Sequence, residues 1–395
     1  MTGPAVMICL GSGGVGKTTV SAAHAISGAM EGRRVVVLTI DPAQRLATTL
    51  GLKAEAGASL GVGQGLGNEP TLVEGPWPGE LWAAMLDPSE TMLTLLNEHA
   101  SPVRAARIAA NPLLANIVGS MSGANEYMAA ERLFQLHHDQ RFDQVVVDTP
   151  PSRHAIDFLD SPQRLTRFID NQLYRVVFAP RRGLLRSVSS ATHLVVRLTA
   201  RLIGAGLVDD VIRLFEDLGE LDQGFHQRAQ ATVALLADDR CGYTLITSPR
   251  QEPLRHAEWI GNQLSERGLR LDAVIVNRLC PFGRQTPETT PTGPAATQPT
   301  ARALAAAPST TGARSAAPVR AKAPLIAEQT ARQRALTENW EQLAALARAE
   351  DELIDKLASR LEADLPLLLL NEQLQPLTTI DGLVEMAAAL SKPPT

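Results

Sequence analysis

The sequence has few cysteines, few aromatic residues and no excess of basic charge. Its three cysteines, Cys9, Cys241 and Cys280, are too few and too far apart for a disulfide framework or a four-ligand zinc site, and they indicate reduced thiols. Aromatic residues make up only 4% of the chain, which argues against a surface that stacks nucleic-acid bases. Acidic residues outnumber basic ones by 42 to 37, whereas proteins that coat nucleic acid usually carry a basic excess. We therefore expect no nucleic-acid partner.

Long apolar runs and a basic N-terminal region are also missing. No segment approaches the ~20 apolar residues of a membrane-spanning helix, and the most apolar helical stretch, 193–208, contains Arg197 and Arg201. The first basic residue is Lys17, so there is no signal-peptide pattern. The 395 residues, 45% of them hydrophobic, are enough for two or three domains or one enlarged α/β domain. These features predict a cytoplasmic globular protein.

Short apolar runs predict buried strands along the whole chain. They occur at 5–10, 34–40, 80–86, 142–148, 243–247, 272–277 and 363–370. The alanine-rich segment from Lys17 to Met30 predicts a helix between the first two strands, and strand–helix–strand units of this length build parallel sheets. The sequence therefore predicts an α/β fold with a mostly parallel, doubly wound sheet. Residues 51–80 are glycine-rich and are expected to be irregular.

Helical patterns over 88–136 and 157–237 interrupt these strands and predict a large helical insertion. Residues 283–324 contain seven prolines and a single acidic residue, a composition that cannot bury enough apolar surface to fold alone. We expect this segment to be a flexible linker. The predicted core comprises 1–90, 140–156, 240–282 and 335–393, and the predicted helical subdomain comprises 91–139 and 157–239.

Residues 11–18, GSGGVGKT, fit the phosphate-binding pattern G-x-x-x-x-G-K-[ST]. A predicted strand precedes this loop and a predicted helix follows it, so backbone N–H groups and the helix dipole are expected to converge on an anion. Lys17 can reach the β- and γ-phosphates of a nucleotide, and the Thr18 hydroxyl can ligate Mg²⁺. The residues expected to bind the nucleotide here are Gly13, Gly14, Val15, Gly16, Lys17, Thr18 and Thr19. The sheet is therefore expected to be that of a P-loop NTPase.

Two carboxylates follow predicted strands. Asp148 ends the strand 142–148, and acidic residues at this point of P-loop enzymes hold Mg²⁺ directly or through water. Asp41 follows the strand 34–40 and can hold an attacking water in line with the γ-phosphate. Because the C-terminal ends of parallel strands face the ligand crevice, both side chains are expected near the loop. Either one could instead cap a helix or a turn.

The three motifs together resemble those of one branch of P-loop ATPases. GSGGVGKTT resembles the deviant Walker A loop of the SIMIBI class, and TIDPAQRLATTLG resembles its switch I. DTPPSRHAIDFL resembles switch II of the arsenite-pump (ArsA) and tail-anchored-protein-targeting ATPases, and His154 with the AIDFL after it favours this branch over ParA. ITSPR (246–250) and VIVNRLCP (274–281) resemble the two adenine-side segments of the branch, and LPLLLLNE (365–372) resembles its C-terminal nucleotide-flanking segment.

This resemblance covers about 1–282 and 335–391, and it implies an ATPase that uses ATP and Mg²⁺. The implied catalytic residues are Lys17 and Asp41, the implied metal ligands are Thr18 and Asp148, and Asn277 and Pro249 are implied at the adenine. The resemblance further implies a dimer whose shape follows its nucleotide state. A membrane-protein client or a membrane transport partner would be coupled to that switch.

One departure from the family pattern affects catalysis. In the family a lysine directly follows the first glycine of the loop and crosses the dimer interface to the partner's phosphates, whereas this chain has Ser12. Hydrolysis by a homodimer should therefore be slow. A paralogue that carries the lysine could supply it in a heterodimer, Arg45 or Arg153 could substitute for it, or the chain could be inactive alone.

A second departure concerns metals. The zinc-binding CxxC pair of the eukaryotic targeting factors is missing, and the predicted linker stands in its position. Each of the three cysteines is expected in or beside a buried strand, where a thiol usually serves as a small apolar group. We therefore predict neither a zinc site nor an arsenite site.

Two other functions stay open on the sequence alone. Ser12 favours an ATP-binding scaffold subunit with little hydrolysis of its own. A MinD- or ParA-like positioning ATPase fits less well, because the chain is long and residues 379–395 contain a single lysine rather than a basic amphipathic tail. The helical region is poor in methionine, which is common in adaptable client grooves, so its apolar stripe over 208–225 is expected to be core.

Overall fold

The fold is that of a computed structural model, which describes residues 3–41, 45–52, 66–111, 123–151, 153–170, 222–282, 323–361, 364–373 and 379–391. The predicted linker, 283–324, lies outside the described residues except for its last two positions, which begin a helix. The predicted apolar stripe lies outside them as far as residue 221. Its last member, Phe225, is buried.

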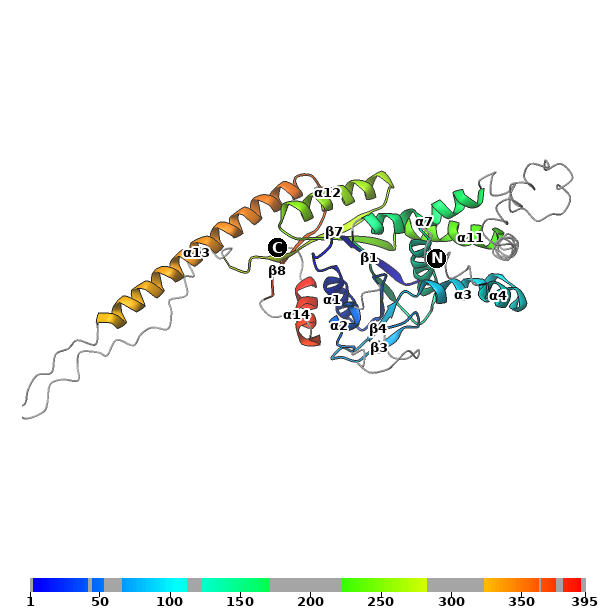
Figure 1. The fold of residues 1–395 in the computed structure, drawn as a ribbon, viewed down its shortest axis with the longest axis horizontal. Coiled ribbons are helices and arrows are strands. Elements are labelled where there is room, and N and C mark those ends of the chain that lie inside the picture. Colours follow the sequence, from blue (N-terminus) through cyan, green and yellow to red (C-terminus); the bar gives the residue numbers. More distant parts are fainter. Residues whose placement is uncertain are drawn as a thin grey trace, which may run out of the picture.

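Eight strands form one sheet in the order β3-β4-β2-β5-β1-β6-β7-β8 (Figure 1). Neighbouring strands are parallel except β3, which runs antiparallel to β4 at one edge. The strands are β1 (Ala5–Gly11), β2 (Arg34–Thr39), β3 (Thr71–Val73), β4 (Glu80–Met85), β5 (Gln144–Asp148), β6 (Cys241–Thr247), β7 (Leu271–Leu279) and β8 (Leu367–Asn371). This confirms the predicted mostly parallel α/β sheet. β3 is an addition, because its segment was expected to be irregular.

The central strands are buried because helices cover both faces of the sheet. Every residue of β5 (QVVVD) and of β6 (CGYTLIT) is buried, which explains why neither sequence alternates between apolar and charged residues. The sheet separates two apolar cores, one on each face. Successive side chains of β1 point to opposite faces, so Ile8 lies in one core and Cys9 lies in the other.

The helices divide between these two faces, as expected for a doubly wound fold (Figure 1). One face carries α1 (Lys17–Met30), α2 (Arg45–Thr49) and α14 (Ile380–Leu390). The other carries α3 (Pro88–His99), α4 (Pro102–Ala109), α6 (Ala124–His138), α7 (Arg153–Asp170), α11 (Asp222–Leu236), α12 (Gln251–Glu266) and α13 (Ala323–Ala358). The helix predicted from Lys17 to Met30 matches α1.

The described helices of the predicted insertion share a core with the sheet. Leu95 of α3, Leu133 of α6 and Phe158 of α7 are fully buried, and they belong to the same apolar cluster as Ile8 of β1. These side chains therefore serve as core rather than as an open groove. The boundaries of a separate helical subdomain stay a prediction.

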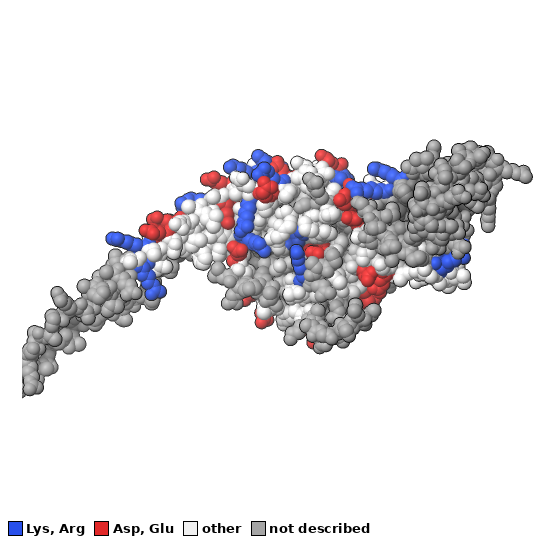
Figure 2. Space-filling model, viewed as in Figure 1, with Lys and Arg blue, Asp and Glu red and all other residues white. Residues whose placement is uncertain are grey.

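Helix α13 is 36 residues long and extends away from the sheet (Figure 1). Its C-terminal part is anchored, because Ile354 and Leu357 are buried and the Glu350 carboxylate accepts a hydrogen bond from the Cys280 backbone N–H at 2.9 Å. Positive and negative side chains are interspersed over α12 and α13 on the face that Figure 2 shows. None of the helices in the described ranges has the length and apolar character needed to cross a bilayer.

The buried carboxylate of Glu131 belongs to a polar cluster that links α6, α11 and α3. Glu131 of α6 is fully buried, and one of its oxygens lies 3.2 Å from Nε of Arg228 in α11 and 3.0 Å from the amide nitrogen of Gln135. Arg228 also pairs with Glu98 of α3. Burial raises the pKa of Glu131 to about 7, and Arg228 only partly offsets this effect.

We expect Glu131→Gln to change the pH dependence of stability. Because the folded pKa of about 7 exceeds the 4.5 of an unperturbed glutamate, the stabilisation from this group is present below about pH 4.5 and is lost as pH rises through about 7. The loss amounts to about 1.4 kcal/mol per pH unit within that window. The variant does not titrate there, so its melting temperature should rise relative to wild type between about pH 5 and about pH 8. Thermal unfolding followed by circular dichroism measures the difference.

The control is Glu252→Gln, which removes a carboxylate of α12 whose side chain is 72% exposed. This variant should keep the pH dependence of the wild type. If the melting temperature of Glu131→Gln differs from that of wild type by the same amount at about pH 5 and about pH 8, Glu131 does not titrate near neutrality.

Candidate nucleotide-binding site

The phosphate loop lies where the strand order of the sheet reverses. β1 is flanked by β5 on one side and β6 on the other, and the chain leaves β1 for β2 while β6, β7 and β8 extend the opposite half. Ligands of open α/β sheets bind at such a switch point, outside the C-terminal ends of the strands. The loop that follows Gly11 is at that end of β1.

Two glycines of the loop are required by close contacts. A Cβ on Gly11 would lie 2.2 Å from the backbone oxygen of Ile246 in β6. Gly16 has a φ of 94°, and a Cβ on it would lie 2.4 Å from the amide nitrogen of Asn277. Any larger residue at either position would push the loop away from its neighbours. The loop is therefore held against β6 and β7 before helix α1 begins.

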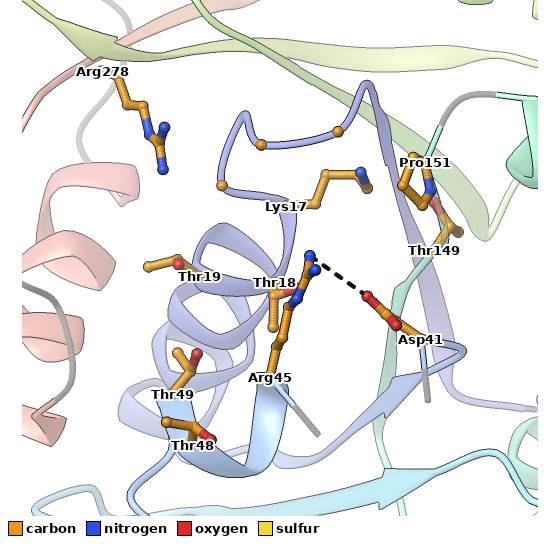
Figure 3. A pocket seen from close by; sticks show the side chains of 13 residues that line it. Lys17, Thr18, Thr19, Asp41, Arg45, Thr48, Thr49, Thr149, Pro151 and Arg278 are labelled. Atoms are coloured by element: carbon orange, nitrogen blue, oxygen red, sulfur yellow. Dashed lines mark ion pairs between the residues drawn. The ribbon is translucent and has the colours of Figure 1, made fainter. Parts of the chain in front are cut away.

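A cavity of about 370 Å³ opens over the loop (Figure 3). Most of the predicted site residues line it, namely Gly13, Gly14, Gly16, Lys17, Thr18, Thr19 and Asp41. Residues predicted to act on one ligand therefore meet around one cavity, although they come from α1, its preceding loop and the end of β2.

Lys17 is buried beneath the loop. Its ammonium donates a hydrogen bond to the backbone oxygen of Ser12 at 2.9 Å, and only 7% of the residue is exposed. Burial lowers the pKa of Lys17, and Asp148 and Asp41 oppose that shift. A phosphate beside the ammonium would favour its charged form in the same way.

Asp148 and Thr18 form an oxygen pair at the end of β5. The Thr18 hydroxyl donates to one carboxylate oxygen of Asp148 at 2.8 Å, and the Thr39 hydroxyl donates to the same oxygen at 3.1 Å. The second carboxylate oxygen is buried and has no hydrogen-bond partner among the described residues. Burial raises the pKa of Asp148 to about 6.

This oxygen pair fits Mg²⁺. Hydroxyl and carboxylate oxygens are the donors that Mg²⁺ prefers, and a divalent cation would stabilise the carboxylate that burial disfavours. Thr18 and Asp148 are the residues that would hold the ion, which would supply charge neutralisation for the phosphates.

Asp41 lies on the other side of the cavity from Thr19 (Figure 3). Its backbone N–H donates to the Thr39 hydroxyl at 3.3 Å, and its carboxylate lies 3.7 Å from the guanidinium of Arg45 in α2. The carboxylate is 21% exposed, so it can meet both solvent and a ligand in the cavity.

Three predicted nucleotide-binding residues do not line the cavity. Val15 is buried in the core, so only its backbone faces the loop. Asn277 of β7 donates its amide hydrogen to the backbone oxygen of Val15 at 2.9 Å, which braces the loop. Pro249 is buried just after β6. The predicted adenine contacts of Asn277 and Pro249 stay predictions.

Several cavity residues were not predicted as binding residues. They are Arg45, Thr48, Thr49, Thr149, Pro151 and Arg278. The Thr149 hydroxyl donates to the backbone oxygen of Cys9 at 2.6 Å, which ties the end of β5 to β1. The quoted switch motifs contain all of these residues except Arg278, which lies in the quoted segment VIVNRLCP (274–281) but was given no role there.

Ser12 and the cysteines are buried near or within the sheet. Ser12 is 7% exposed, and its hydroxyl has no hydrogen-bond partner among the described residues. Cys9 lies in β1, Cys241 begins β6 and Cys280 follows β7, and all three are buried free thiols. Burial raises the pKa of Cys9 and of Cys241 to about 12, which favours their protonated forms.

Comparison with curated proteins gives relatives of low identity. An uncharacterized protein of Streptomyces coelicolor is 27% identical over 306 residues, which cover 74% of this chain and 66% of that protein. ATPase GET3 of Malassezia globosa is 29% identical, and the match covers 41% of this chain and 43% of the relative. The arsenical pump-driving ATPase of Escherichia coli is 30% identical, with 42% of this chain and 27% of the relative covered. The chain thus spans less than two thirds of the length of these relatives.

The sequence profile of the anion-transporting ATPase family matches residues 5–290. That range contains the phosphate loop, both strand-end carboxylates and the strand that carries Asn277. Because the profile spans more than half of the chain, and as the motifs predicted, this chain belongs to the anion-transporting ATPase (ArsA) family.

Proposed function

We propose that this protein is a Mg²⁺-dependent ATPase that hydrolyses ATP to ADP and phosphate. The observation that carries the proposal is the convergence of Lys17, Thr18, Asp148 and Asp41 at the C-terminal edge of the sheet, around the glycine loop. Such a set supplies what phosphoryl transfer requires, which is mainly positioning and charge stabilisation.

Each residue has a distinct role in this proposal. Lys17 and the loop N–H groups stabilise charge on the β- and γ-phosphate oxygens. Thr18 and Asp148 hold the metal ion. Asp41 orients the attacking water and accepts a hydrogen bond from it, and the guanidinium of Arg45 lies 3.7 Å from the same carboxylate.

We further propose a nucleotide-driven dimer that acts with a membrane-related client or transport partner. The names of two relatives support this proposal, since one is an arsenical pump-driving ATPase and the other is ATPase GET3. The partner subunit is either a second copy of this chain or a paralogue with a lysine in place of Ser12. We propose that the protein works in the cytoplasm without nucleic acid, zinc or arsenite.

The second candidate is an ATP-binding scaffold subunit with little hydrolysis of its own. The observation that favours it is Ser12, a short neutral side chain that is 7% exposed and cannot carry a positive charge to a partner's phosphates. A turnover assay beside an equilibrium binding assay separates the two. Tight Mg²⁺–ATP binding with turnover supports the ATPase, and tight binding without turnover supports the scaffold.

Lys17→Ala should weaken Mg²⁺–ATP binding by about 100-fold or more, because a charge-assisted hydrogen bond to a phosphate contributes up to about 3 kcal/mol. Isothermal titration calorimetry measures the dissociation constant. Lys356→Ala is the control, since Lys356 is exposed on α13 and should bind like wild type. Unchanged affinity of Lys17→Ala would show that the loop is not the phosphate site.

Asp41→Asn should lower the single-turnover rate by about 100-fold and change ATP affinity by less than about threefold. A water-orienting carboxylate acts mainly in the transition state, so its loss affects kcat more than binding. Asp143→Asn provides the control, because Asp143 precedes β5 at the opposite end of the sheet and pairs with Arg34. Reduced affinity with an unchanged single-turnover rate would make Asp41 a structural residue.

Ser12→Lys should raise the steady-state ATPase rate of the purified chain by about 10-fold or more. A cation at a transferring phosphoryl group can contribute about 10³–10⁵ in rate, and the new lysine would supply one if two copies meet. Ser12→Ala tests the effect of changing a buried residue and should stay at the wild-type rate. If the wild-type chain already turns over quickly and Ser12→Lys adds nothing, no cation is missing, and Arg45 or Arg153 is the candidate substitute.

A further inference from the structure

We propose that Arg278 is a nucleotide-binding residue whose guanidinium holds the α-phosphate at the end of the cavity opposite Asp41. The inference rests on the proposed ATP site and assigns a role to a residue of the segment 274–281 for which the sequence predicted none. Arg278 lines the same cavity as Lys17 and Thr19.

The backbone of Arg278 has a conformation that disfavours most side chains. Its φ is 65°, and it is the only residue other than glycine with a positive φ in the described part of the chain. The pairing of β7 with β8 also shifts register between Val276 and Leu279, so Arg278 lies in a bulge. Strained residues that persist at the edge of a cavity often serve its ligand, and bulges redirect side chains.

The bulge brings two consecutive side chains to the phosphate loop. In a regular strand, the side chains of Asn277 and Arg278 would point to opposite faces. Here Asn277 donates to the backbone of Val15 within the loop, while Arg278 lines the cavity beside Gly16. The left-handed backbone conformation of Arg278 thus places its guanidinium over the loop that Asn277 holds in place.

The Arg278 side chain is available to a ligand. Arg278 is exposed, whereas Asn277 and Leu279 on either side of it are buried. No ion pair or hydrogen bond links its guanidinium to another described residue, although Arg34, Arg141 and Arg267 each hold a carboxylate. An arginine that has no partner among the described residues and lines a cavity with a glycine loop fits an anion, and a guanidinium donates charge-assisted hydrogen bonds to phosphate oxygens.

The position of Arg278 along the cavity selects the α-phosphate. Asp41, Thr149 and Pro151 mark the γ-phosphate end of the proposed site, and the Lys17 side chain extends toward Pro151 (Figure 3). Arg278 comes from the opposite side, with its guanidinium directed toward Thr19 in α1 (Figure 3). A triphosphate whose γ-phosphate meets Asp41 therefore presents its α-phosphate to Arg278.

The test measures ADP binding to the full chain without Mg²⁺, so that the metal cannot distinguish phosphate oxygens. Arg278→Gly should weaken ADP binding about 10- to 100-fold and should not lower the melting temperature, because glycine adopts a φ of 65° without strain. Arg278→Lys should have an intermediate affinity, since it keeps the charge and loses the fork. Arg255→Ala, which removes one exposed arginine of α12, should bind like wild type.

A second measurement uses the two diastereomers of ADPαS, in which sulfur replaces one or the other non-bridging α-oxygen. A guanidinium that bonds one of these oxygens makes the wild type discriminate between the diastereomers, and Arg278→Gly should reduce that ratio by at least half. ADP affinity within twofold of wild type in Arg278→Gly, or weaker binding with an unchanged ratio, would overturn the assignment to the α-phosphate. A wild-type chain that does not bind ADP would instead refute the proposed nucleotide site.

Discussion

The close approach of the glycine loop to β6 and β7 is the constraint on which the proposed site depends. Gly11 lies against the backbone of Ile246, and Gly16 lies against the side chain of Asn277, with no room for a Cβ at either position. These contacts fix where α1 begins. They therefore also fix where Lys17 and Thr18 lie relative to Asp148 on the other side of β1. A methyl group at either glycine would displace the loop. The Thr18 hydroxyl would then move away from the Asp148 carboxylate, which it now contacts at 2.8 Å.

The sequence predicts the sheet well because burial leaves a strong signal. β5 and β6 lie between other strands and beneath helices on both faces, so their sequences are mostly uncharged and do not alternate between apolar and charged residues. The family assignment followed from three motifs that lie at the ends of such strands. β3 and α2 were not predicted, because three and five residues are too few to show a period.

The site was only partly predictable for a different reason. Lys17, Thr18 and Asp148 stand in motifs whose spacing reflects chemistry, whereas Arg278 stands out only by its backbone angle and its place in the cavity. Neither property can be read from residue types. The burial of Glu131 beside Arg228 is likewise a product of how three helices pack, and a charged residue on a helix normally predicts an exposed face.

Burial divides the cations at the cavity into two kinds. Lys17 is enclosed, so a phosphate beside it would meet a charge that water screens little. Arg45 is 66% exposed in its side chain and already shares its charge with Asp41, and Arg278 is exposed as well. The two arginines therefore act weakly until a ligand covers them and excludes water. The strength of the electrostatic interaction between these arginines and a ligand therefore develops only in the complex. For this reason a site built around one buried lysine can still depend on residues at its rim.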